Sequence, residues 1–180
     1  MTKARDLANA GTALTSVSAT ELGYLDGVTS AVQTQIDTKA PSTSPTLVTP
    51  VLCSPEERCT VSATAATGTI NFDAVTQGVL YYTTAATGNW TLNVRGSSGA
   101  TLDSSLATGD AITVVFINTN TGTAYYATGF QVDGSAVTPK WQNGVAPSAG
   151  NVNSVDIYTY TIIKTGSATY TVLASQTKFA

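Results

Sequence analysis

The sequence contains no histidine, which removes the side chain most often used as a general base or a metal ligand. A Ser-His-Asp or Cys-His catalytic site is therefore impossible within this chain. Its two cysteines, Cys53 and Cys59, cannot complete a tetrahedral zinc site by themselves. A loop-closing disulfide between them is sterically feasible, whereas synthesis in a cytoplasm favours free thiols, so both states stay open.

Charge is also scarce, at 11% of residues against about 25% in an average soluble domain. The pI of about 4.6 and the isolated positions of the eight Lys and Arg residues leave no basic stripe for phosphates, so we expect no nucleic-acid partner. The longest strongly apolar run is 114–117, which predicts no membrane insertion. No apolar stretch follows Lys3 and Arg5, so we expect no signal peptide and synthesis in a cytoplasm.

The acidic residues are too dispersed for the paired carboxylates that cleave glycans. Most lie singly at expected turns, and the only adjacent pair, Glu56-Glu57, would point in opposite directions on an extended chain. No glycine-rich phosphate loop joins a strand to a helix. The sequence therefore predicts a protein that is not an enzyme, with no catalytic residue, metal or cofactor.

In place of charged residues the chain is rich in Thr, Ser, Ala, Gly and Asn. Only about a fifth of the chain consists of Leu, Ile, Val and Phe. The net charge of −3 is too small to hold the chain open by repulsion. Many β-branched threonines with few aliphatic residues favour strands that bury further surface against identical copies.

Residues 1–17 are polar and short of large apolar side chains. They are either a disordered tail or an arm that becomes ordered when it docks on a neighbouring protein. The candidate docking residues are Lys3, Arg5, Asp6 and Leu7.

Residues 18–39 carry the only helical pattern. Ser18 and Glu21 fit a capping box, and apolar residues then recur at steps of three and four, with Thr29 as the weak member. Asp26-Gly27 divides the pattern, so the longer helix covers about 28–38. An isolated helix of this length is marginal in water, which favours a self-associated bundle over packing on the chain's own β-domain. The predicted trimer seam consists of Leu22, Leu25, Val28, Val32 and Ile36.

Residues 40–58 contain four prolines at near-regular spacing, which predicts an extended, irregular linker or stalk. From residue 59 to 180 the apolar pattern has a period of two, and Ala111 to Ile117 is apolar on both faces, as expected of a central strand. Turn signals every 8–12 residues predict an antiparallel β-sandwich or jelly-roll-like domain.

Three turns are expected to close hairpins: Asn118–Gly122, Asp133-Gly134 and Lys164–Ser167. A short repeat, Thr-Ala-Ala-Thr-Gly, occurs at 64–68 and again at 84–88. Two copies are too few for a solenoid, so we interpret them as equivalent turns that lead into equivalent strands.

Aromatic side chains are the best candidates for contacts with a ligand. Tyr81-Tyr82 and Tyr125-Tyr126 are adjacent pairs, so one member of each must face away from the core if it lies in a strand. Outward rings can stack on sugars or, as we favour, fill an interface between subunits. The candidates are Tyr82, Tyr126 and Trp141, although Trp141 can equally anchor the domain core.

Ser18-Ala-Thr-Glu-Leu-Gly-Tyr-Leu-Asp-Gly-Val-Thr-Ser-Ala-Val-Gln-Thr-Gln-Ile-Asp-Thr-Lys-Ala-Pro41 resembles a linker repeated in phage tail fibres and other virion appendages, especially of marine and cyanobacterial phages. The segments 3–9, 140–147, 156–164 and 170–179 resemble the two ends of such proteins. The resemblance implies a homotrimer with an N-terminal attachment end and a β-rich distal end. It transfers no catalytic residue.

The function expected from this resemblance is a short virion fibre or spike, assembled in the host bacterial cytoplasm, whose arm docks on tail, portal-proximal or capsid proteins. The chain has one linker motif where long fibres have many, so a capsid decoration protein that staples shell subunits is the alternative. A receptor-binding protein for host surface glycans is the second alternative.

Overall fold

The computed structural model describes residues 18, 20, 51 and 53–179. The chain divides into two compact units between Cys53 and Ser54, and the strands of the described residues belong to the second unit. The predicted docking arm (1–17), most of the linker and all five trimer-seam residues lie outside the described residues. Residues 53–58 contain no helix or strand and are exposed.

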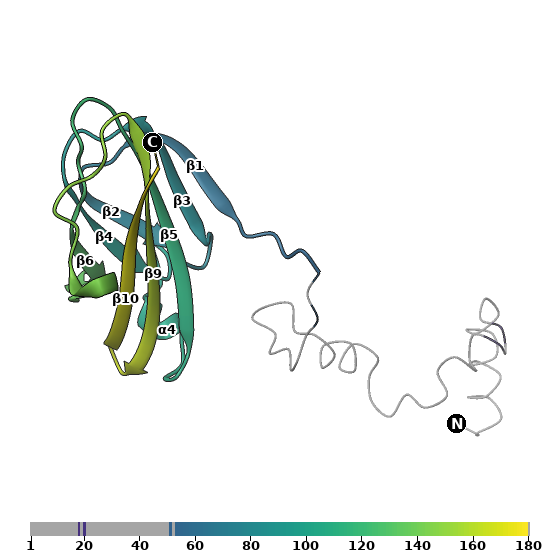
Figure 1. Cartoon of the computed structure of the whole chain (residues 1–180). Coiled ribbons are helices and arrows are strands. Elements are labelled where there is room, and N and C mark those ends of the chain that lie inside the picture. Colours follow the sequence, from purple (N-terminus) through teal and green to yellow (C-terminus); the bar gives the residue numbers. More distant parts are fainter. Residues whose placement is uncertain (1–17, 19, 21–50, 52, 180) are drawn as a thin grey trace, which may run out of the picture. The chain divides into compact units, whose positions relative to one another are not determined.

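The structure is mainly β, as the period-two pattern predicts (Figure 1). A six-stranded sheet has the order β1-β3-β5-β9-β10-β8, and a four-stranded sheet has the order β2-β4-β6-β7. The first sheet contains β1 (Cys59–Ala65), β3 (Val79–Ala85), β5 (Ala111–Asn120), β9 (Ser154–Gly166), β10 (Thr169–Phe179) and β8 (Lys140–Trp141). The second contains β2 (Gly68–Asp73), β4 (Trp90–Arg95), β6 (Ala127–Val132) and β7 (Ser135–Ala136). A helix, α4 (Leu102–Ser105), and a 3-10 turn, η1 (Gln142–Gly144), lie in the connections.

From β1 to β6 the chain alternates between the two sheets, so successive strands of one sheet run in the same direction. The pairs β1–β3, β3–β5, β2–β4 and β4–β6 are all parallel, and so is the short pair β8–β10. Antiparallel pairing is found at β5–β9, β9–β10 and β6–β7. The prediction of an antiparallel domain is therefore wrong for the pairing among β1 to β6, because the turns there pass between sheets instead of reversing within one.

The repeated Thr-Ala-Ala-Thr-Gly turns make these passages. Each turn leaves the six-stranded sheet after β1 or β3 and enters the four-stranded sheet at β2 or β4. Ala66 and Ala86 are buried at the two corners, and the Thr87 amide donates to the Ala66 carbonyl at 3.0 Å. Gly88 gives the Thr67 side chain room, because a Cβ there would lie 2.8 Å from Oγ1 of Thr67 and would force that side chain to move. The prediction that equivalent turns lead into equivalent strands is confirmed.

Two of the three predicted hairpins are present. Asp133 and Gly134 have φ values of 51° and 80° and join β6 to β7, as a type I′ turn requires. The strands β9 and β10 form the long hairpin after Lys164. The prediction of a hairpin at Asn118–Gly122 is wrong, because β5 continues to Asn120 and the chain then crosses to β6 in the other sheet.

The core lies between the inward faces of the two sheets and is rich in aromatic rings. Trp90 of β4 packs edge-on against Phe116 of β5 and Tyr158 of β9, with ring centroids 5.7 and 5.5 Å apart. Phe130 of β6 stacks on Tyr160 of β9 at 4.5 Å. These contacts bury both sheets against each other, since each of the five side chains is at most 3% exposed.

Candidate functional site

The outward face of the six-stranded sheet carries no charged side chain on β1, β3, β5, β9 or β10. Because paired residues of neighbouring strands share a face, the registers identify its members. One row across the strands is Val61, Tyr81, Ile117, Ile157 and Thr177, and the next is Cys59, Val79, Val115, Thr159 and Ser175. The remaining members are Ala111, Thr113, Thr119, Val155, Thr161, Ile163, Thr171, Leu173 and Phe179. We call this surface the uncharged face.

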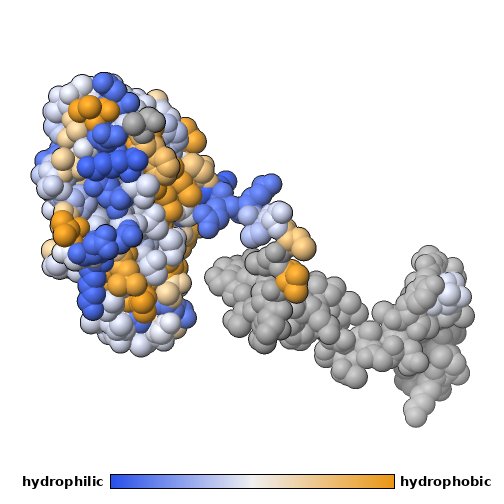
Figure 2. Space-filling view, in the orientation of Figure 1, coloured by the Kyte–Doolittle hydropathy of each residue, from blue (hydrophilic) through white to orange (hydrophobic). Residues whose placement is uncertain are grey.

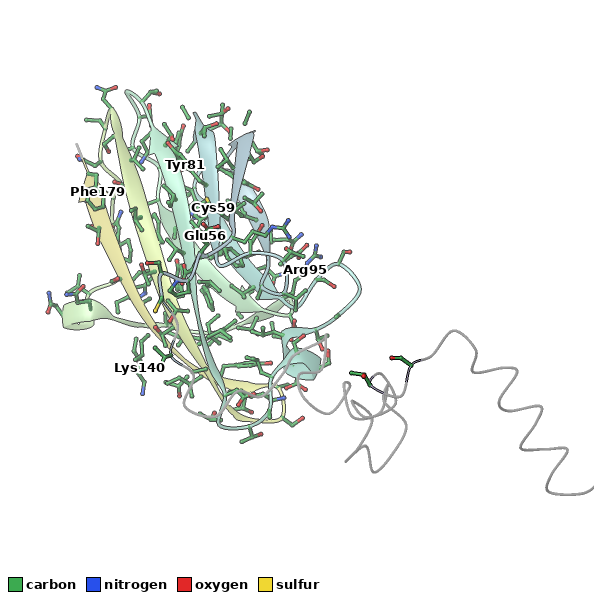
Figure 3. All side chains as sticks on the ribbon, turned by 90° about the vertical axis from the view of Figure 1, so that its right-hand side faces the viewer. Glu56, Cys59, Tyr81, Arg95, Lys140 and Phe179 are labelled. Atoms are coloured by element: carbon green, nitrogen blue, oxygen red, sulfur yellow. The ribbon has the colours of Figure 1, made fainter. Side chains whose placement is uncertain are left out.

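Several large apolar side chains of the uncharged face are open to solvent. Val61 is 64% exposed, Phe179 51% and Leu173 46%. Figure 3 looks onto this face, with Cys59, Tyr81 and Phe179 spread across β1, β3 and β10. Figure 2 shows apolar residues gathered along the side of the domain where β1, β3 and β5 lie in Figure 1. The surface is thus apolar without being covered by any described element.

The outward face of the four-stranded sheet has the opposite character. Nδ2 of Asn93 donates to Oδ1 of Asn71 at 2.8 Å, across the pair β2–β4. Two residues further along the same strands, Arg95 and Asp73 form an ion pair at 2.6 Å. The two outward faces of the domain therefore differ in charge and polarity.

A groove of about 520 Å³ runs beside β6 and brings together two of the three predicted contact aromatics, Tyr126 and Trp141. Both rings are half-buried, and the indole of Trp141 packs edge-on against Tyr160 at 5.8 Å. Trp141 therefore both anchors the core and lines the groove. The other lining residues are small, apolar or hydroxylated, among them Thr128, Val137, Thr138, Pro139, Ala146 and Pro147.

Tyr82, the third predicted aromatic, is not an outward residue. Its ring packs edge-on against Phe116 at 5.3 Å and belongs to the margin of the core. Tyr81 is the outward member of the pair, because it lies in register between Val61 and Ile117. Period-two alternation requires one outward tyrosine, but it does not indicate which one.

The buried or half-buried charged groups mostly serve the fold. Nζ of Lys164, which is 7% exposed, donates to the carbonyls of Asp103 and Leu106 at 2.6 and 2.9 Å and pairs with the Asp103 carboxylate at 2.8 Å. The Lys164 bond, with help from the Ala168 amide, lowers the pKa of Asp103. This cluster fastens the β9–β10 hairpin to helix α4.

Asp133 performs the corresponding task at the other end of the helix. Its two carboxylate oxygens accept from the amides of Leu102 and Asp103 at 2.7 and 3.0 Å. A polar hollow of about 370 Å³ beside it is also lined by Arg95, whose guanidinium is held by Asp73. The charged groups in this hollow are thus already paired.

The buried carboxylate of Asp156 lies in a polar network at the end of the core. Oδ2 of Asp156 accepts from the Asn151 amide at 2.9 Å and from Nδ2 of Asn120 at 3.2 Å. Burial raises the pKa of Asp156 above its ordinary value of 3.8, against the smaller opposing effects of these bonds and of Lys178. The sequence gives no sign of this network, because its members come from three separate segments.

Within residues 53–179, no three or more Asp, Glu or Cys side chains gather in a way that would hold a metal ion. Glu56 and Glu57 are exposed in the segment before β1, and Cys53 and Cys59 are exposed free thiols. None of the helices in the described part of the chain is long and apolar enough to cross a membrane.

No protein-family model, curated protein or solved structure matches this chain. A function must therefore be argued from the structure itself, and two surfaces serve for this, the uncharged face and the groove at Trp141. The sequence already carried a signal for the first, since 111–117 has apolar residues at both odd and even positions. This pattern predicted a central strand, and one of the two apolar faces of that strand is turned outward.

Proposed function

We propose that this protein is a non-enzymatic structural component of a bacteriophage particle that works as a homotrimer. In this proposal it is a short fibre or spike, which docks through its N-terminal arm and presents the β-domain outward. The observation that carries the proposal is the contrast between the two outward sheet faces. A broad uncharged surface beside a charged ladder is typical of a subunit that is covered in its assembly.

Two further features support the structural role. The charged side chains Lys164, Asp103 and Asp133 are engaged in contacts that hold the helix α4 and the long hairpin in place. The linker at 18–41 resembles that of phage appendage proteins. We also propose that the two sheets form a β-sandwich, with parallel strands where β1 to β6 alternate between its layers.

The test of this function is a reconstruction of the virion, together with quantification of this chain in purified particles. A few trimers at the tail support the fibre or spike, whereas scores of trimers on the shell support the decoration protein. Absence of the chain from intact purified particles would contradict both forms of the proposal. The localisation proposed here is thus the virion, after assembly in the host cytoplasm.

Glycan binding is the second candidate, and the groove beside β6 favours it. A half-buried Trp ring next to a Tyr offers the flat apolar surface on which sugar rings stack, and Thr128 supplies a hydroxyl. A glycan array with host polysaccharides tests this function. Thr138→Arg places a bulky side chain at an exposed position of the groove and should abolish binding, while Thr69→Arg on β2 is the matched control. Clean negatives across host polysaccharides would remove this candidate.

A further inference from the structure

We propose that the uncharged face is the surface on which three copies of this chain meet around a threefold axis. This inference rests on the proposed homotrimer and adds the surface through which it forms. The outward residues of β5, among them Val115 and Ile117, would lie nearest the axis, because β5 is the middle one of the five strands of the uncharged face. The helical seam predicted for residues 22–36 would then reinforce a trimer that the β-domains already make.

The chemistry of the face suits burial against itself. Its polar members are hydroxyls, and some already have partners within the chain. Oγ1 of Thr113 and Oγ1 of Thr161 share a hydrogen bond at 3.2 Å, and Oγ1 of Thr119 donates to the Tyr82 carbonyl at 3.0 Å. Such groups lose little on leaving water, whereas an unpaired charge would lose several kcal/mol.

The width of the uncharged face fits three copies. Stacked sheets pack about 10 Å apart, so each sheet reaches about 5 Å toward its partner. If the six-stranded sheets of three copies each lie about 5 Å from a common axis, they form a triangle whose sides are about 17 Å long. The five strands from β1 to β10 span four gaps of about 4.8 Å, or about 19 Å. The sixth strand, β8, brings the charged Lys140 onto the same side, just beyond the Leu173 position where the triangle ends.

Identical copies are the occupant that these observations favour. A partner of different chemistry would be recognised mainly through charge, and the uncharged face offers no charge and only hydroxyls as polar groups on its five strands. The chain enters the face at β1, which follows the predicted helical seam and the linker at 40–58. Parallel copies related by a threefold axis necessarily turn the same face toward that axis. Because the chain contains few aliphatic residues, its fold gains from burying further apolar surface against other copies.

The experiment is sedimentation velocity on the full chain at micromolar concentrations, with charges placed on side chains that the isolated subunit already exposes. Val61→Lys and Leu173→Lys lie near opposite sides of the face and should leave the subunit folded. Each should raise the concentration of half-dissociation at least about tenfold, since a charge must then be buried at the interface. Thr69→Lys is the matched control, because it adds the same charge to an exposed outward position of the four-stranded sheet.

The wild-type chain is expected to sediment at three times 18.4 kDa, with Thr69→Lys unchanged and thermal melts confirming that both face variants fold. A wild-type dimer, or trimers that persist in both face variants with the wild-type dissociation constant, would overturn the inference. Val32→Asp and Ile36→Asp weaken the predicted seam instead. If they alone dissociate the trimer, the interface lies in the helical segment and not on the uncharged face. The inference can fail in this way while the chain is still found in the virion, so the two proposals are tested separately.

Discussion

The side chains of Asp156 and Asn118 lie opposite each other in register on β9 and β5, and neither has any exposed surface. Oδ1 of Asp156 and Oδ1 of Asn118 are both buried without a hydrogen-bond partner. Two acceptors cannot bond to each other unless one of them carries a proton. A protonated Asp156 can donate to Asn118, and burial raises the pKa of Asp156 in the direction that favours this form.

Asp156→Asn is expected to raise the free energy of unfolding at pH 8 by about 1–2 kcal/mol. The new side-chain oxygen keeps the bonds from Asn151 and Asn120, while its Nδ2 donates to the orphaned oxygen of Asn118. Urea denaturation at one fixed protein concentration measures the effect, because assembly makes stability depend on concentration. A variant less stable than the wild type at pH 8 would contradict this account of the network.

Asp156→Asn should also remove one component of the pH dependence of the free energy of unfolding. A folded-state pKa raised above 3.8 gives stability that is complete at lower pH and is lost as the pH rises through the raised value. Asp103 has the opposite sign, because its lowered pKa gives stability that is lost as the pH falls below 3.8. The difference between Asp156→Asn and the wild type should therefore grow from about pH 3 to pH 8, while the acid-side loss due to Asp103 persists in both. The Lys178 ammonium, on β10, opposes the shift of Asp156 but does not reverse it.

The strands could largely be predicted from the sequence, but the way they pair could not. The apolar run from Ala111 to Ile117 predicts a central strand, and β5 does lie between β3 and β9. The repeat at 64–68 and 84–88 predicts equivalent turns, yet a turn of that composition does not reveal whether it reverses within a sheet or passes to another one. Ala66 is at a corner only because a second layer is present to receive β2. Parallel pairing therefore depends on long-range packing.

The candidate site was predictable to a similar degree. Tyr126 and Trp141 do meet in one groove, whereas the choice of Tyr82 over Tyr81 failed because alternation alone does not assign the inward side. Asp133 was expected only as part of a turn that closes a hairpin. The turn is present, but its carboxylate reaches amides 30 and 31 residues away, a partnership that no local pattern encodes.

Tyr158 and Tyr160 offer a matched pair, because both lie on β9, face the core and have no exposed surface. The Tyr158 hydroxyl accepts from Nε2 of Gln176 at 2.8 Å and from the Ala127 amide at 3.4 Å. The Tyr160 hydroxyl is buried without a partner. Tyr158→Phe is therefore expected to cost about 1–2 kcal/mol of unfolding free energy, and Tyr160→Phe to be neutral or stabilising. Urea denaturation of the two variants measures both changes. An equal loss of unfolding free energy in both would show that the hydroxyl of Tyr160 has a hydrogen-bond partner.

Asp133→Asn is expected to loosen the start of helix α4. The substitution keeps a residue that tolerates the φ of 51° but leaves one acceptor oxygen for the two amides of Leu102 and Asp103. A cost of about 1–2 kcal/mol follows, with faster hydrogen exchange at those two amides. Asp110→Asn is the control, because the Asp110 carboxylate accepts only from the Ala107 amide in an exposed local turn and its loss should cost less. Unchanged exchange at Leu102 and Asp103 in Asp133→Asn would show that the four-residue helix is held without the Asp133 carboxylate, by Lys164, the Thr101 cap and packing of Leu102.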